Sequence, residues 1–326
     1  MASVLYEFLR RHHSRRHQRD SAQYSRRTRA GPGQIQVEKI SGTISVSERD
    51  RKHMTQPKNF GFGEDEKMLR DTARKFLEDN LSTDRLHALV ADNPDPGRKP
   101  DCKWDQDLWN NIVELGWTTI VVPESEGGIG MSLVALASVV EETGRAGLPA
   151  PFIATANSSL VLRECDTPAA RSLLSAVAEG QAVTLAATPR SGSWLPDDTD
   201  ATYANGKLSG SAWFVQDARK VDTLIVKARA ADGIMLISVP AAESGVEITP
   251  DAIIDLTRDQ AHIEFRDVDV SDHQILAQAG TGNAVLERAE PGILTLVAAD
   301  MVGAGEWLLQ TTVEYAKVRH QFDRSN

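Results

Sequence analysis

The chain of 326 residues lacks the features that assign many proteins to a class at first sight. It has two cysteines, Cys102 and Cys165, which form neither a disulfide framework nor a metal-ligand spacing and fit a reducing compartment. No apolar run approaches the roughly 18 residues of a membrane span, so we expect a soluble chain without one. The sequence also has no nucleophile elbow and no phosphate-binding loop. We therefore expect no metal site, and none of these motifs supplies a function.

Positive charge is scarce outside the first 53 residues. Residues 1–53 hold 12 Lys and Arg against 5 Asp and Glu, whereas the rest of the chain carries a net charge of −17. Such an acidic body argues against nucleic-acid binding, because polyanions are held chiefly by Lys and Arg. The basic head, residues 1–57, has few large apolar residues, and we expect it to be disordered.

Three explanations of this basic head are open. It resembles an organellar transit peptide in bearing Arg and Ser and few acids. It is also compatible with an arm that binds nucleic acid or a membrane surface, or with upstream sequence translated ahead of a start at Met54. We expect a cytoplasmic protein, or a mitochondrial one if the head is a transit peptide.

Changes in hydrophobic periodicity divide the remainder into predicted domains. Residues 58–181 show helical spacing, with a helix over 64–80 and another that Thr167 caps and Pro168 begins. Residues 182–282 consist of short β-branched or alternating runs broken by Asn-Gly, Asp-Gly and Ser-Gly turns. This pattern is typical of an antiparallel sheet or a small barrel.

The last segment, residues 283–326, returns to helical spacing and predicts one long helix. Gly303 and Gly305 within it should let a neighbouring helix approach closely. The predicted fold class is thus a multidomain α+β protein: a helical domain, a central antiparallel β-barrel domain and the start of a C-terminal helical bundle. A lone helix of such a bundle leaves an apolar face uncovered, so we expect either a truncated chain or an oligomer that completes the bundle.

The most informative stretch runs over residues 104–145 and reads WDQDLWNNIVELGWTTIVVPESEGGIGMSLVALASVVEETGR. It predicts an amphipathic helix ending at Gly116, a turn, a glycine-rich loop and a second helix ending at Gly144. The loop has the order G-G-x-G after a proline, which excludes the G-x-G-x-x-G dinucleotide motif that follows a strand. The block resembles the acyl-CoA dehydrogenase family, whose N-terminal helical domain carries an ELGW…VPEE-GG-G-S run.

This resemblance implies a cofactor and a reaction. Family members bind FAD between the β-domain and the C-terminal bundle. A glutamate removes the proton α to an acyl-CoA thioester while a hydride leaves the β-carbon for the flavin, and electrons pass to an electron-transfer flavoprotein. The base must be a carboxylate in a dry pocket, where burial raises its pKa. Oligomers are usual in the family.

Two segments of the β-domain correspond to flavin contacts of the family. In AATPRSGSW, Ala187 stands at the family threonine, Thr188 at its glutamate and Ser193 at its serine. A plain β-turn is the alternative interpretation. In AWFVQDA, Phe214 and Val215 stand where the family has an aromatic and an aliphatic at the flavin edge; alternatively, the aromatics only fill the barrel.

A third element, YAKVRHQF, resembles the family run R-x-Q-F-G, whose Arg reaches the FAD pyrophosphate of a neighbouring subunit and whose Phe packs near the adenine. The corresponding residues are Arg319, Gln321 and Phe322. A guanidinium binds a pyrophosphate through paired, charge-assisted hydrogen bonds. Asp323 replaces the usual glycine, and a frayed helix end is the alternative.

No residue of the chain stands clearly as the catalytic base. The usual base of the family lies further along than residue 326, and the position used in other branches falls at Ile293, beside Leu294. Glu290 is the one weak candidate, and a solvated helix face is the other interpretation of it. We expect an acyl-CoA dehydrogenase-like flavoprotein subunit, inactive by itself. A non-catalytic subunit of a hetero-oligomeric dehydrogenase and a flavin monooxygenase or oxidase on the same fold are the alternatives.

Overall fold

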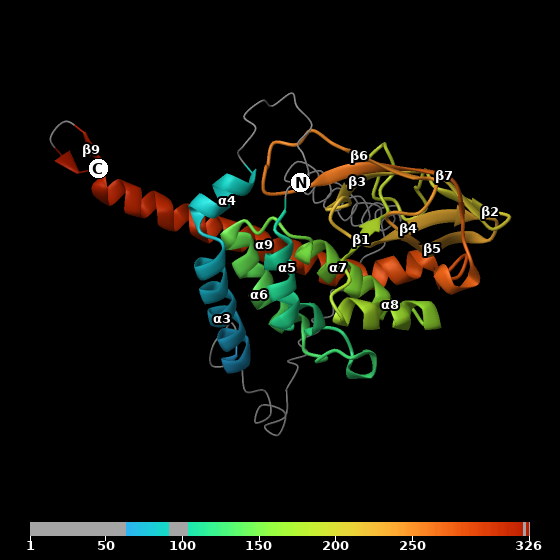
Figure 1. Cartoon of the computed structure of the whole chain (residues 1–326), viewed down its shortest axis with the longest axis horizontal. Helices are drawn as coiled ribbons and strands as arrows, with labels where there is room; N and C mark the ends of the chain where they lie inside the picture. The colour runs from blue at the N-terminus through green and yellow to red at the C-terminus, as the bar shows by residue number, and fades with distance from the viewer. Residues whose placement is uncertain (1–62, 91–103, 322–323, 326) are drawn as a thin grey trace, which may run out of the picture. The chain divides into compact units, whose positions relative to one another are not determined.

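Figure 1 shows the chain as a computed structural model, which describes residues 63–90, 104–321 and 324–325, the last two and residue 321 by their backbone alone. These residues belong to the unit Gly61–Asn326. The basic head predicted over residues 1–57, with its disorder, lies outside the described residues, as does Phe322. The limits of the three predicted domains stay predictions.

The helix α5 (Gln106–Glu114) has the predicted amphipathic character, with Leu108 and Ile112 buried and Asp107 and Asn111 exposed. In α8 the Thr167 hydroxyl accepts the Ala170 N–H at 3.2 Å and Pro168 is the first helical residue, which confirms the predicted cap. The elements are α3 (Glu64–Asn80), α4 (Thr83–Val90), α5 (Gln106–Glu114), the 3₁₀ turns η1 (Trp117–Thr119) and η2 (Glu124–Glu126), α6 (Leu133–Ala146), α7 (Phe152–Arg163) and α8 (Pro168–Ala178).

Glycines shape the connection between α5 and α6 and the end of α6. Gly116 has φ 76°, the left-handed conformation expected after the first helix. The prediction that Gly144 ends the second helix is wrong, because α6 continues to Ala146 and Gly147, at φ 64°, takes the left-handed position. Gly144 serves a contact instead: a Cβ there would lie 2.1 Å from the Asp300 carbonyl oxygen of the last helix.

Eight strands form one mixed sheet, mostly antiparallel, in the order β6-β7-β3-β2-β4-β5-β8, with β1 added parallel to β4. The predicted Asn-Gly turn joins β2 to β3, and Asn205 and Gly206 have φ of 53° and 77°, as a tight hairpin requires. The strands are β1 (Val183–Ala186), β2 (Thr202–Ala204), β3 (Lys207–Gln216), β4 (Thr223–Ala230), β5 (Gly233–Pro240), β6 (Val246–Pro250), β7 (Gln260–Asp269) and β8 (Ile275–Ala277), with the 3₁₀ turn η3 (Asp272–Gln274) before β8.

The predicted long helix is α9 (Gly282–Val318), followed by the short strands β9 (His320–Gln321) and β10 (Arg324–Ser325). It starts against β5 and then packs on α7 and α6 (Figure 1). The two glycines differ: a Cβ on Gly303 would stand 1.7 Å from the Glu141 carbonyl oxygen, whereas one on Gly305 meets nothing within 4 Å. The predicted close approach is therefore confirmed at Gly303 and wrong at Gly305.

By length and composition alone, α9 is long and apolar enough to cross a membrane. Core helices of globular proteins can be equally long and apolar. The first half of α9 does carry buried residues, Val285, Ala289 and Leu296. Its second half exposes many apolar side chains: Met301, Val302, Trp307, Leu308, Leu309, Val313, Tyr315 and Val318.

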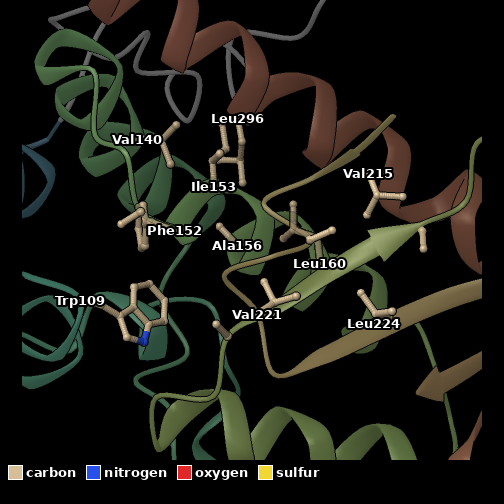
Figure 2. Close-up of a cluster of buried hydrophobic side chains, with 14 of the residues drawn as sticks. Trp109, Val140, Phe152, Ile153, Ala156, Leu160, Val215, Val221, Leu224 and Leu296 are labelled. Carbon is tan, nitrogen blue, oxygen red and sulfur yellow. The ribbon is translucent and has the colours of Figure 1, made fainter. Parts of the chain in front are cut away.

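One buried cluster joins the helices to the sheet (Figure 2). The cluster includes Phe152 and Leu160 of α7, Leu296 of α9 and Val215 of β3. Because burial of each such side chain contributes about 1.5–3 kcal/mol, this cluster fixes the place of β3 relative to α7 and α9. The predicted fold class, a helical region followed by a sheet and a further long helix, is confirmed.

Candidate functional site

The segment that follows β1 lies beside a bulge in β3, a strand that also pairs with β7 and β2. The Trp213 N–H donates to the Thr188 carbonyl oxygen at 2.8 Å, and the two residues form an isolated antiparallel bridge. The pairing of β3 with β7 shifts register between Ala212 and Val215. The two segments that sequence assigned to a flavin, residues 187–193 and 213–215, are therefore neighbours in space.

The bulge turns adjacent side chains in different directions. Phe214 has φ 58°, rare for an aromatic residue, and its side chain is 47 % exposed. Val215 is 1 % exposed and lies in the buried cluster of Figure 2, so only its backbone can meet a ligand on the Phe214 side. Gly192 lies close by, since a Cβ on it would be 3.8 Å from the Phe214 ring. Phe214 thus offers an open ring beside the loop.

Trp213, by contrast, is half-buried, and its ring has two partners. The His262 ring stacks on it, with centroids 4.3 Å apart and 9° between planes. The Arg190 guanidinium carbon lies 5.0 Å from the Trp213 ring centroid, a favourable cation–π distance. His262 Nδ1 lies 2.9 Å from Asp251 Oδ1. The alternative that the aromatics only fill the sheet thus fits Trp213 and does not fit Phe214.

The loop after β1 supplies polar groups near this ring. Ala187 and Thr188 follow β1 directly and are half-buried. The Ser193 hydroxyl donates to Asp198 and accepts the Leu195 N–H at 3.2 Å. A ligand that takes a hydrogen bond from Ser193 must compete with the Asp198 carboxylate.

A buried ion pair between Asp217 and Lys220 follows the bulge in the chain. Lys220 Nζ donates to Asp217 Oδ1 at 3.0 Å and to the Pro149 carbonyl oxygen at 3.1 Å. Burial raises the pKa of Asp217, and the Lys220 charge opposes that rise. Asp217 also takes a left-handed backbone, with φ 52°, and its N–H donates to the Asp259 carbonyl oxygen at 2.9 Å.

Arg319 lies away from the bulge and from the loop of residues 187–193. It follows α9 and lies 19 residues, about 28 Å of helix, beyond Asp300, the residue that Arg258 ties to the loop before β7. The Arg319 guanidinium lies 5.9 Å from the Tyr315 ring centroid. Gln321 belongs to β9, with a side chain outside the described set, and Phe322 lies outside the described residues altogether. This separation fits a role toward another subunit and excludes contact with the Phe214 ring of the same chain.

The weak base candidate, Glu290, is half-buried on α9, one residue before Pro291. Glu287 is exposed, as expected for a solvated face. Ile293 packs against the cluster of Figure 2 and against a second buried cluster, which includes Val285 and Ala289, so the position that other family branches give to a base carries a core side chain. In the described ranges, no group of three or more His, Cys, Asp or Glu is placed to hold a metal ion.

Sequence reasoning missed several polar contacts that hold this region. Arg258 makes two hydrogen bonds of 2.7 Å to Asp300, which tie the loop before β7 to α9. The stack of Trp213 on His262 joins β3 to β7. Only the spacing of Asp217 and Lys220, three residues apart, could have indicated an ion pair, because the other partners are far apart in the chain.

Comparison with known proteins gives one consistent answer. Residues 63–180 match the acyl-CoA dehydrogenase N-terminal domain. The acyl-CoA dehydrogenase IpdE2 of Mycobacterium tuberculosis is 27 % identical over 269 residues, which cover 80 % of this chain and 66 % of the relative. The chain thus spans just under two thirds of that relative's length.

Solved structures agree with the sequence match. A chain in the structure of the electron transferring flavoprotein of Acidaminococcus fermentans has a TM-score of 0.71 and 26 % identity, covering 82 % of this chain and 72 % of that one. Butyryl-CoA dehydrogenase from Megasphaera elsdenii has a TM-score of 0.69 and 22 % identity with the same coverage, and it shares the fold. Residues 63–180 are thus similar to the N-terminal domain of acyl-CoA dehydrogenases, and the chain as a whole resembles members of that family in sequence and in fold.

Proposed function

We propose that this protein is a flavoprotein subunit that acts in the α,β-dehydrogenation of an acyl-CoA thioester, with FAD as hydride acceptor and an electron-transfer flavoprotein as the next carrier. The observation that carries the proposal is the Phe214 ring, which is turned outward by a left-handed backbone beside the loop of residues 187–193. The similarity to acyl-CoA dehydrogenases supports the reaction class.

The residues at the bulge fit a flavin. A planar ring system needs an apolar surface on one side and hydrogen-bonding groups at its rim. The half-exposed Phe214 ring supplies the surface, and Thr188 and Ser193 supply polar groups within the adjoining loop. Bound there, the isoalloxazine would supply a two-electron acceptor. The chain's own contribution is to orient it and to cover one face from water.

The proton step has a candidate with a clear test. Glu290 is the half-buried carboxylate near the start of α9, and removal of a proton α to a thioester requires a base. If Glu290 acts as that base, Glu290→Gln should lower turnover of acyl-CoA by at least about 100-fold without changing FAD affinity. Glu287→Gln, on the exposed face one turn earlier, is the matched control.

FAD binding is tested by titrating flavin-free protein with FAD and following flavin fluorescence. We expect Phe214→Ala to weaken binding at least about tenfold, since an aromatic stack contributes about 0.5–1.5 kcal/mol beyond its buried area. Ile254→Ala, which removes a fully exposed (101 %) aliphatic from the same region, should bind as the wild type does. Equal loss in both variants, or none in either, would contradict the site.

A second candidate is the non-catalytic subunit of a hetero-oligomeric dehydrogenase. The aliphatic Ile293, in place of an acid, and the apolar side chains that α9 exposes over residues 301–318 favour it. In that case Arg319 would complete the FAD site of the partner. The protein would then bind FAD without oxidising any acyl-CoA, and Arg319→Met would lower the partner's activity. Oxygen uptake without an acceptor protein would point to an oxidase or monooxygenase instead.

A further inference from the structure

The turn of residues 213–217 holds two left-handed residues that are not glycine. Phe214 has φ 58° and Asp217 has φ 52°. Aspartate tolerates the left-handed region, because its short polar side chain can form local hydrogen bonds, whereas a bulky aromatic residue rarely adopts it. Backbone strain of this kind costs on the order of 1–3 kcal/mol for each residue and persists only where the surroundings enforce it.

Contacts from several segments hold Asp217 in its left-handed conformation. The residue is 2 % exposed. Its carboxylate accepts from Lys220 Nζ, its carbonyl accepts from the Lys220 N–H at 2.9 Å, and its N–H donates to the carbonyl of Asp259. Lys220 Nζ also reaches the Pro149 carbonyl oxygen, which precedes α7. These hydrogen bonds connect the turn to the residues before α7 and to the loop before β7, and they also link Asp217 to Lys220 within the turn.

Hydrogen bonds also fix the backbone on both sides of Phe214. Before it, the Trp213 N–H is fixed on Thr188, and after it, the Gln216 carbonyl oxygen accepts from the Thr184 hydroxyl at 2.7 Å. With the backbone fixed on both sides, Phe214 keeps its positive φ, and its ring stays half-exposed beside Gly192. The charged groups facing Asp217, besides Lys220, are Arg258 and Asp259.

We propose that Asp217 is the positioning residue of the flavin site: held by Lys220, it locks the turn in the backbone conformation that presents the Phe214 ring. This inference rests on the proposed function, because Phe214 is taken as the flavin contact. Asp217 itself, buried among protein groups, touches no ligand. Its effect on a flavin passes through Phe214.

The test compares three variants in the full chain. Asp217→Gly keeps the left-handed backbone without strain and removes only the side chain, and Asp217→Asn keeps a hydrogen-bond acceptor and a tolerance for this backbone. Asp267→Gly is the matched control, since Asp267 is a left-handed aspartate (φ 51°) in β7 whose side chain bonds Ser209 at 2.9 Å. Hydrogen exchange of residues 210–220 is measured without flavin, and FAD affinity and the visible circular dichroism of bound flavin are measured afterwards.

We expect Asp217→Gly to speed exchange over residues 210–220 alone, to weaken FAD binding about tenfold or more because fewer molecules hold the competent turn, and to alter the flavin dichroism. Asp217→Asn should restore most of both properties. The control should match the wild type in both. Because Asp217→Gly could fail to fold, Lys220→Gln is the reserve variant: it removes the charge that holds Asp217 while keeping a donor toward the Pro149 carbonyl oxygen, and it should show the same changes to a smaller degree.

Two results would overturn the inference. Wild-type exchange and wild-type FAD affinity in Asp217→Gly would show that the turn needs no carboxylate. Faster exchange throughout the sheet with unchanged flavin dichroism would show a purely structural role. If the wild-type protein itself binds no FAD, the proposed flavin site fails and this inference with it. If the wild type and Asp217→Gly bind FAD equally, only this inference fails.

Discussion

Alanine at Gly303 should force α6 and α9 apart, whereas alanine at Gly305, two residues later in the same helix, should stabilise the protein. Inside a helix, alanine is favoured over glycine by about 0.5–1 kcal/mol. At Gly305 nothing lies within 4 Å of the new methyl group. Gly305→Ala should therefore raise the free energy of unfolding by roughly that amount.

At Gly303 the same methyl group would stand 1.7 Å from the Glu141 carbonyl oxygen and 2.8 Å from the Arg145 nitrogen. Both are backbone atoms of α6, so no side-chain rotation relieves the clash. Overpacking costs about 1–3 kcal/mol or more, and moving α9 outward also disturbs the contact of Gly144 with Asp300. We expect a net loss of about 2 kcal/mol for Gly303→Ala.

Urea unfolding followed by far-ultraviolet circular dichroism measures both variants. A loss of about 2 kcal/mol corresponds to a fall of roughly 3–4 °C in the thermal midpoint for a protein of this size. The slope of free energy against urea should not change, since both variants expose the same surface on unfolding. Equal urea midpoints for the two variants would refute the close crossing of α6 and α9 at Gly303.

Two further predictions concern buried charges. Burial lowers the pKa of Lys227, which is 5 % exposed, so Lys227→Met should raise the free energy of unfolding at pH 7 by about 1–2 kcal/mol. In titrations with urea this gain should shrink as the pH rises from the lowered pKa toward 10.5, because in that window the unfolded wild type still binds a proton that the folded one has released; a gain independent of pH would contradict the assignment. Arg74 makes hydrogen bonds of 2.9 and 2.7 Å to Glu142, which is 1 % exposed, so Arg74→Met should cost about 3 kcal/mol, because that buried carboxylate then keeps the more distant Arg145, 3.8 Å away, in place of two short hydrogen bonds. Thermal unfolding should show most of the loss recovered in Arg74→Met/Glu142→Leu and no loss in the exposed control Arg266→Met; a double variant as unstable as Arg74→Met would argue against this origin.

Local chemistry explains which parts of the fold the sequence could predict. A threonine before a proline caps a helix through its own next residues, and an Asn-Gly pair makes its hairpin from its own backbone, so Thr167 and Asn205 could be interpreted without knowing their distant neighbours. Gly144 could not. Its glycine character suggested a helix end, but the reason for a glycine there is the carbonyl of Asp300, more than 150 residues away in the chain.

The same distinction applies to the candidate site. The resemblance to the family placed Phe214 and Val215 together at a flavin, yet a one-residue shift of register between β3 and β7 buries one and exposes the other. Register depends on the partner strand, and the segment AWFVQDA does not contain that partner. Likewise, Ser193 corresponds to a family serine, but its bond to Asp198 shows that its hydroxyl already has an acceptor.

Backbone strain identifies the site more sharply than the motif does. Four residues other than glycine have positive φ in the part of the chain that the structure describes: Asn205, Phe214, Asp217 and Asp267. Three are Asn or Asp, which tolerate this conformation, and two of those, Asn205 and Asp267, lie in a hairpin or on an exposed strand. Phe214 is the exception, because an aromatic side chain gains nothing locally that would offset the strain. Its conformation must be stabilised by contacts from β1, β7 and the loop of Pro149, and the result of that stabilisation is an apolar ring held out into solvent. Folding alone would favour burying the ring, so its exposure is best explained by a ligand that covers it.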